Sequence, residues 1–168
     1  MKITENNWGR VTKIVLESMK SSMCCGLGTV GADGIPHVTP IGSLVFTGVG
    51  KGFYFEQLPV KTPENIRGNA ELCFMAVNSS RLYWLKFFIT GKFSALPGIR
   101  LYGTAGEKRN ATDLEKQLWQ SKVKSFKKYK GYDILWKDLT RGREVTFHSF
   151  EPVLCGKATE RAAESLAG

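Results

Sequence analysis

The chain has 168 residues, enough for one domain that buries its own core without disulfides or a structural metal. With 42% hydrophobic and 23% charged residues it has the composition of a globular protein, which argues against a disordered or fibrous chain, and no apolar run approaches the ~18 residues of a membrane span. The net charge of +9 raises the question of an anionic partner. The opening residues, MKITENNWGR, lack a signal-peptide pattern, so we expect a cytoplasmic protein with no membrane partner.

The first half of the chain predicts one helix and then β-structure. Residues 5–21 carry apolar side chains at helical spacing, at Trp8, Val11, Val15 and Met19. Asp33-Gly34 then separates two β-compatible runs, which is a strong signal for a hairpin. A glycine-rich turn at 48–52 leads into the strand FYFEQL, and after a short helix ELCFMAVN, residues 71–78, is apolar enough to be covered on both faces.

The second half predicts more strands and one lysine-rich helix. Residues 81–96 and 98–108 are expected to be two long strands separated by Pro97-Gly98. A capping box at Thr112-x-x-Glu115 starts a helix over 112–130 whose lysines mostly lie opposite its apolar arc. A last strand precedes a small, polar segment, so we expect a single domain over 1–155 and a flexible tail over 156–168. Adjacent strands with short connections favour an antiparallel sheet that closes into a barrel.

The cysteines and histidines predict no metal site. They include no C-x-x-C pair and no zinc-like spacing. We interpret the four cysteines as buried or half-buried thiols in a reducing compartment, with a redox role for the adjacent Cys24 and Cys25 as the alternative. The residues concerned are Cys24, Cys25, Cys73, Cys155, His37 and His148.

The stretch KTPEN, residues 61–65, has the pattern of a helix start, with Thr62 as N-cap, Pro63 in the first helical position and Glu64 in the first turn. Such an end presents backbone N–H groups and a partial positive charge, and Lys61 adds a full charge beside it. Together these groups could hold a phosphate. The alternative is that Thr62 only caps a connecting helix and that Lys61 is solvated.

The chain resembles the flavin-binding split-barrel family related to pyridoxamine 5'-phosphate oxidase. The resemblance covers most of residues 8–107 and rests on an ordered series of motifs, none sufficient alone. They are the hairpin segment 29–34, PHVTP at 36–40, FYF at 53–55, Lys61-Thr62-x-x-Asn65 and the apolar strand 72–77. This family implies a six-stranded antiparallel Greek-key split β-barrel that forms a homodimer with FMN in a groove at the subunit interface. Related barrels also bind FAD, a deazaflavin or haem.

The resemblance also implies which residues hold the cofactor. Lys61 and Thr62 would bind the phosphate, and Asn65 would support that turn. Phe55 and Glu56 would lie near the ribityl chain. Four consecutive residues would run along the flavin ring: Thr39, Pro40, Ile41 and Gly42. A glycine there would let a flat ring approach the strand.

One departure from the family pattern argues against vitamin B6 phosphate as the substrate. The oxidase carries an arginine and histidine set near its end, which GREVTFHSF, residues 142–150, matches only loosely. We interpret His148 as a packed strand residue in place of a catalytic acid, leave His37 unassigned and name no catalytic side chain.

Three functions are compatible with these observations. The leading one is an FMN-dependent oxidoreductase that takes a hydride from a reduced nicotinamide or similar donor and passes electrons to a small acceptor. The second is a flavin-binding electron carrier or sensor without turnover. The third, a nucleic-acid-binding barrel, is disfavoured because the lysines cluster on the 112–130 helix while the aromatic residues occupy strand positions.

Overall fold

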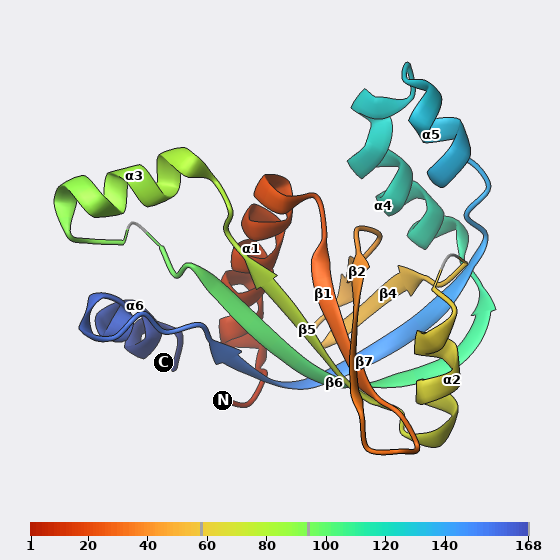
Figure 1. The fold of residues 1–168 in the computed structure, drawn as a ribbon, viewed down its shortest axis with the longest axis horizontal. Coiled ribbons are helices and arrows are strands. Elements are labelled where there is room, and N and C mark those ends of the chain that lie inside the picture. Colours follow the sequence, from red (N-terminus) through yellow and green to blue (C-terminus); the bar gives the residue numbers. More distant parts are fainter. Residues whose placement is uncertain (58, 94, 168) are drawn as a thin grey trace.

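The computed structural model describes residues 1–57, 59–93 and 95–167. These residues form one curved antiparallel sheet of seven strands in the order β2-β1-β5-β6-β7-β4-β3 (Figure 1). The strands are β1 Cys25–Val30, β2 Pro36–Ile41, β3 Val45–Gly48, β4 Lys51–Phe55, β5 Glu71–Val77, β6 Gly98–Asn110 and β7 Arg141–Pro152. The predicted antiparallel split barrel is confirmed, with seven strands in place of six.

The two edge strands of this sheet are consecutive in the chain. Only residues 42–44 join β2 to β3, although these strands stand at opposite ends of the strand order. Such a short connection forces the two ends of the sheet toward each other, so the sheet curls into a barrel that stays open along one seam. Register shifts in the long pair β6–β7 contribute to that curvature.

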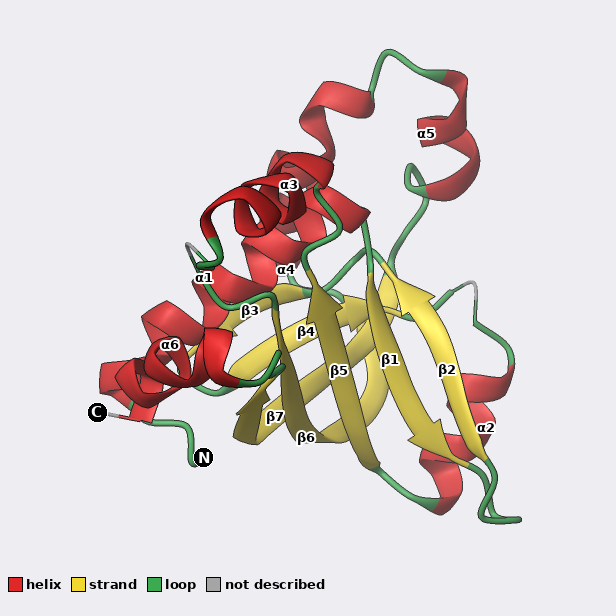
Figure 2. Cartoon of the chain, turned by 60° about the vertical axis from the view of Figure 1, so that its left-hand side comes forward, coloured by secondary structure: helices red, strands yellow, loops and turns green. Residues whose placement is uncertain are grey.

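In the described residues, seven helical segments surround the sheet. They are α1 Glu5–Ser22, α2 Lys61–Gly68, α3 Arg81–Thr90, α4 Asp113–Val123, η1 Lys124–Phe126, α5 Lys130–Leu135 and α6 Lys157–Ala167. Figure 2 shows α1 and α6 on one side of the curved sheet and α2 on the other. None of the helices in the described ranges is long and apolar enough to span a bilayer.

Helix α1 forms as its apolar spacing predicts. Thr4 accepts a hydrogen bond from Asn7 N in a capping box, and Val11 and Val15 are buried against the sheet. The main core cluster lies between α1 and the strands, while a smaller cluster, which includes Phe53, Phe55 and Trp119, lies under α4 and α5. The second cluster fixes α4 over the β3–β4 end of the sheet, near the seam.

The prediction of a strand over 81–96 is wrong, because Arg81–Thr90 forms helix α3. Ser80 accepts a hydrogen bond from Tyr83 N, and Gly91 ends the helix in the left-handed conformation, donating from N to Phe87 O at 2.7 Å. The run of aromatic residues suggested β-structure, but the caps at Ser80 and Gly91 stabilise a helix. The helix stands away from the sheet (Figure 1).

Two other predicted segments also differ. The helix expected over 112–130 keeps its capping box but ends at Val123 and is followed by η1 and α5. The segment expected to be a flexible tail forms helix α6, and Leu166 packs in the main core cluster. The segment is rich in Ala and Glu, which are good helix formers, and Ala162 and Ala163 pack on the core together with Leu166 and dock the helix.

Gly142 is required by the close contact between β7 and β4. A Cβ at this position would overlap the carbonyl oxygen of Tyr54 and lie 2.6 Å from Phe53 Cζ. We therefore expect Gly142→Ala to lower the free energy of unfolding by about 1–3 kcal/mol. Urea unfolding with Gly106→Ala as the control tests this, because a Cβ at Gly106 would meet its nearest atom at 3.4 Å. Equal stabilities of the two variants would contradict the packing argument.

Candidate functional site

A groove lies along the seam where β2 passes into β3. The cavity measures about 310 Å³ and is formed by the end of β2, the next two residues, the end of β4 and the segment after α5. Five of the nine residues predicted from the sequence line it: Thr39, Pro40, Ile41, Gly42 and Phe55. Its other lining residues are Ser43, Pro59, Trp136 and Leu139.

Helix α2 is fastened to one end of this groove by hydroxyl and amide contacts. Thr62 Oγ1 and Thr39 Oγ1 share a hydrogen bond of 2.9 Å, and His37 Nε2 lies 2.9 Å from the same Thr39 oxygen. Asn65 Nδ2 donates to Thr29 Oγ1 at 3.0 Å, which ties α2 to β1. The first turn of α2, where Thr62 and Asn65 lie, is therefore held beside the Thr39 end of the groove.

Thr62 does not cap α2, contrary to the expectation from KTPEN. The N-cap is Val60, whose side chain makes no capping bond, and the helix begins at Lys61. Thr62 is fully buried. Its short hydroxyl side chain finds a partner in Thr39 across the sheet edge, which satisfies a polar group that burial would otherwise leave unpaired.

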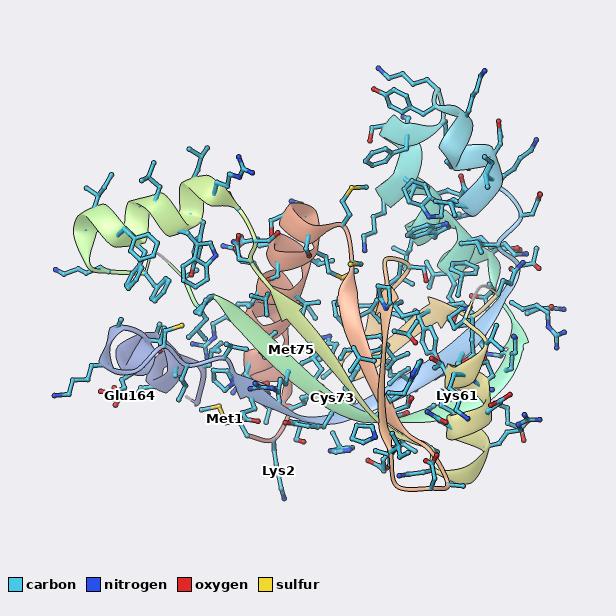
Figure 3. All side chains as sticks on the ribbon, in the orientation of Figure 1. Met1, Lys2, Lys61, Cys73, Met75 and Glu164 are labelled. Atoms are coloured by element: carbon cyan, nitrogen blue, oxygen red, sulfur yellow. The ribbon has the colours of Figure 1, made fainter. Side chains whose placement is uncertain are left out.

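Lys61 remains available at the surface beside this turn. Its Nζ lies 3.2 Å from Glu64 Oε2, and both side chains are about half exposed. Such an exposed pair contributes little to stability, so an anion can compete for the ammonium at small cost. The first turn of α2 also carries backbone N–H groups without intrahelical partners. Figure 3 shows Lys61 on α2, on the side of the sheet away from α3 and α6.

Glu56 lies in the interior and does not line the groove, contrary to its predicted place near a ribityl chain. Its buried carboxylate accepts hydrogen bonds from Arg143 Nε at 2.9 and 2.8 Å and from Tyr54 Oη at 2.8 Å. Lys108 Nζ stands 3.7 Å from the same carboxylate. Burial and the neighbouring carboxylate raise the pKa of Tyr54. Glu56 therefore joins β4, β6 and β7 behind the groove and positions Phe55.

The glycine at position 42 serves a contact with the protein itself. A Cβ there would lie 2.9 Å from the carbonyl oxygen of Met23, the residue that ends α1. Lys122 Nζ donates to the carbonyl oxygens of Gly42 and Leu44 at 3.2 Å each. The end of the groove opposite α2 is thus fixed by α1 and α4, in a way the sequence did not indicate.

Comparison with known proteins agrees with the fold. A sequence model of the family described as pyridoxamine 5'-phosphate oxidase matches residues 11–149. The chain belongs to this family. No curated protein sequence gives a match. The family inferred from the sequence motifs is therefore confirmed.

Solved structures share the fold of this pyridoxamine 5'-phosphate oxidase family member at low identity. An FMN-binding protein from Syntrophomonas wolfei has a TM-score of 0.62 at 14% identity, covering 89% of each chain. The haem storage protein HutZ from Vibrio cholerae has a TM-score of 0.51 at 14% identity, covering 84% of this chain and 94% of its own. A protein described as F420 reductase has a TM-score of 0.50 at 13% identity, covering 76% and 88%.

Several groove residues of this family member were missed by the sequence analysis. Trp136 and Leu139 follow α5 and reach the groove only because α4 and α5 fold back over the β3–β4 end of the sheet. Lys122 falls among the apolar positions of the helix expected over 112–130, which suggests a buried aliphatic stem or a contact with a partner chain, and its contact with the Gly42 carbonyl was not predicted. An aromatic residue and a leucine just beyond a helix end carry no local sign of a site.

The two histidines occupy different surroundings. His37 lies beside Thr39 at the groove. His148 is exposed on β7, and its Nε2 stands 3.2 Å from Glu71 Oε2, so it is a strand residue but not a packed one. Among the described residues, no three His, Cys, Asp or Glu side chains are grouped to hold a metal ion.

Cys25 is expected to be unreactive. Burial raises the pKa of its thiol to about 12, and Sγ donates a hydrogen bond to Ile41 O at 3.3 Å. At pH 8 almost none of it is thiolate, which is the reactive form. Iodoacetamide should therefore modify exposed Cys155 long before Cys25, as read by peptide mass spectrometry. Equal rates at the two positions in folded protein would refute the assignment.

Proposed function

We propose that this family member binds FMN in the groove at the seam and acts as a flavin-dependent oxidoreductase. The observation that carries the proposal is the groove itself, whose strand wall 39–42 runs from the first turn of α2 to the end of α1. One end offers cationic and N–H donors suited to a phosphate, and the other offers flat, largely apolar walls suited to a ring. Membership of a pyridoxamine 5'-phosphate oxidase family and an FMN-binding structural neighbour support it.

The phosphate would be held at the first turn of α2. The Lys61 ammonium and the free N–H groups there are the donors, and Thr62 and Asn65 fix the position of the turn. Each charge-assisted contact contributes about 1.5–3 kcal/mol. The helix-end field alone would add only about 0.3–1 kcal/mol, so the specific donors dominate.

The flavin ring would lie along β2. This strand is at the edge of the sheet, so one side of its backbone has no strand partner. Unpaired N–H and C=O groups of such a strand are suited to the alternating donors and acceptors on the polar edge of a flavin. Phe55 and Trp136 supply apolar walls.

A second copy of the chain would complete the site. A cavity of about 310 Å³ is at the lower limit for pockets of drug-sized ligands, which span roughly 300–1,000 Å³. Apolar side chains are exposed beside the groove, with Val38 on β2 68% exposed and Ile35, in the turn before β2, 63% exposed. A homodimer interface there would cover these side chains and enclose the groove.

The residues that line the groove include no titratable side chain. The protein therefore binds and orients, while bound FMN would supply the hydride and electron transfer. The proposed donor is a reduced nicotinamide or a similar compound, and the proposed acceptor is a small molecule.

The purified protein provides the test. We expect a flavin absorption spectrum, FMN on release by denaturation, and oxidation of NADH or NADPH faster than by free FMN. A yellow protein without that acceleration would favour the electron carrier or sensor. A protein that binds neither FMN nor FAD nor a deazaflavin, or that shows only a haem spectrum, would overturn the proposal.

A further inference from the structure

Helix α3 carries apolar side chains on all sides, yet none of its residues is buried. Four of its apolar side chains are between 53% and 78% exposed: Leu82, Leu85, Phe88 and Ile89. A helix that is apolar all round is normally covered, either by a protein core or by lipid. The outer face of α3, formed by these four residues, is therefore an exposed apolar surface of the kind that marks a contact with another molecule.

The inner face of α3 is firmly attached to the chain around it. Trp84 Nε1 and Tyr83 Oη donate hydrogen bonds to backbone carbonyl oxygens at 2.7 and 2.6 Å. The ring of Phe87 stacks on that of Phe93, with the centroids 3.9 Å apart. Because these aromatic contacts fix the orientation of the helix, the outer face cannot turn inward to bury its own apolar side chains.

The part of the chain that contains α3 carries only positive charge. Residues 72–106 include no Asp or Glu, while Arg81, Lys86 and Lys92 lie on the helix or just after it. The stretch 116–132 also lacks acidic residues. Its η1 and α5 region carries four exposed lysines: Lys124, Lys127, Lys128 and Lys130.

Helix α3 and this lysine cluster stand at the same end of the molecule. Figures 1 and 2 both show α3 and α5 beyond the upper edge of the sheet, while α2 lies toward the lower edge. One end of the protein therefore combines an exposed apolar helix with a concentration of positive charge.

This combination fits an anionic lipid surface better than a second copy of the chain. Helices that lie in the headgroup region of a membrane pair an apolar face with Lys and Arg side chains. Each Lys or Arg close to an anionic bilayer raises the affinity about fivefold. Two copies in contact through α3 would instead bring the cations of one helix against those of the other, which disfavours that pairing.

We propose that the protein attaches to anionic membranes through this end. The outer face of α3 enters the boundary between headgroups and acyl chains, and the lysines of η1 and α5 lie against the anionic headgroups. The expectation of no membrane partner rested on the lack of a membrane span, which a helix lying on the surface does not need. The attachment does not depend on a flavin in the groove.

Cosedimentation of the full chain with lipid vesicles tests the attachment. Vesicles of phosphatidylcholine with about 30% phosphatidylserine are compared with vesicles of phosphatidylcholine alone. We expect binding to the anionic vesicles that weakens as salt is added, and far weaker binding to the neutral ones. No binding to the anionic vesicles, or equal binding to both kinds, would overturn the proposal.

The apolar contribution is measured with Leu82→Gln/Ile89→Gln, which should weaken binding to the anionic vesicles about 30-fold. Val49→Gln/Leu114→Gln makes the same kind of change at exposed positions outside α3 and should leave the affinity nearly unchanged. Equal losses in the two variants would rule out α3 as the contact. Sedimentation equilibrium without lipid identifies the other occupant: a lower molar mass of the α3 variant would make this face an interface between copies and refute the proposal.

The position of the charge is tested with Lys127→Gln/Lys128→Gln, which should also weaken binding about 30-fold. Lys13→Gln/Lys51→Gln removes the same net charge at exposed positions on α1 and β4 and should weaken it far less. Equal losses in the two lysine variants would mean that only the net charge matters, which would contradict attachment through this end.

Discussion

Replacing Lys61 by alanine and Thr62 by valine together is expected to weaken FMN binding by about 2–4 kcal/mol, roughly a 30- to 900-fold rise in Kd. The first substitution removes the ammonium beside the phosphate position. The second keeps the side-chain volume but removes the hydroxyl that bonds to Thr39 and holds the first turn of α2. Titration of FMN-free protein, followed by the flavin absorbance change, measures the loss.

Riboflavin separates the phosphate contribution from general damage to the groove. Because riboflavin lacks the phosphate, its affinity should change far less than that of FMN in the same variant. Lys127→Ala/Thr146→Val is the control, since it removes one charge and one hydroxyl at exposed positions that do not line the groove. Equal losses for riboflavin and FMN, or an unchanged FMN affinity, would exclude α2 as the phosphate site.

Glu56→Gln is expected to lower the free energy of unfolding by about 3 kcal/mol, or roughly 6–12 °C in Tm. The Glu56 side chain is fully buried and the Arg143 side chain is 10% exposed. The glutamine amide oxygen and the Gly106 carbonyl oxygen, 3.0 Å away, can still accept hydrogen bonds from the guanidinium, but the negative charge that compensates its buried positive charge is lost. An uncompensated buried charge is far more costly than a lost surface pair.

A double-mutant cycle with Arg143→Gln tests whether the pair is the cause. We expect the double variant to be less destabilised than the sum of the two single variants, by about 1–3 kcal/mol. Urea unfolding gives all four values. Additive effects would mean that the two residues act separately and that Glu56 does not position β4 through Arg143.

Much of the fold could be predicted because local chemistry and tertiary structure agree. The spacing of Trp8, Val11, Val15 and Met19 gives α1, and Asp33-Gly34 gives the β1–β2 hairpin, whose first and last pairs are Cys25–Ile41 and Val30–Pro36. Strand β5 was predicted as 71–78 and forms over Glu71–Val77. In each case no distant contact competes with the local preference.

The predictions were wrong where a distant contact or a helix cap determines the local structure. The aromatic residues of 81–90 suggested a strand, but Ser80 and Gly91 cap a helix whose outer face is exposed. Thr62 had every local feature of an N-cap, but its hydroxyl forms a hydrogen bond with Thr39, 23 residues earlier in the chain. Gly42 was expected to admit a ring, and the carbonyl of Met23 occupies the space instead. None of these partners can be identified from spacing along the chain.

The groove was only partly predictable for the same reason. Its strand wall, residues 39–42, is continuous in sequence and could be identified from one motif. The opposite wall comes from Pro59, Trp136 and Leu139, which the closing of the sheet and the folding back of α5 bring together. Residues that are brought together only by the folding of distant segments form no recognisable sequence motif.

The most direct test of the central claim is a crystal structure of the protein with FMN. We predict the phosphate within hydrogen-bond distance of Lys61 Nζ and the first-turn N–H groups of α2, and the flavin ring along residues 39–42. FMN bound elsewhere on the barrel, or a groove filled by a second copy of the chain in the presence of saturating FMN, would contradict the account.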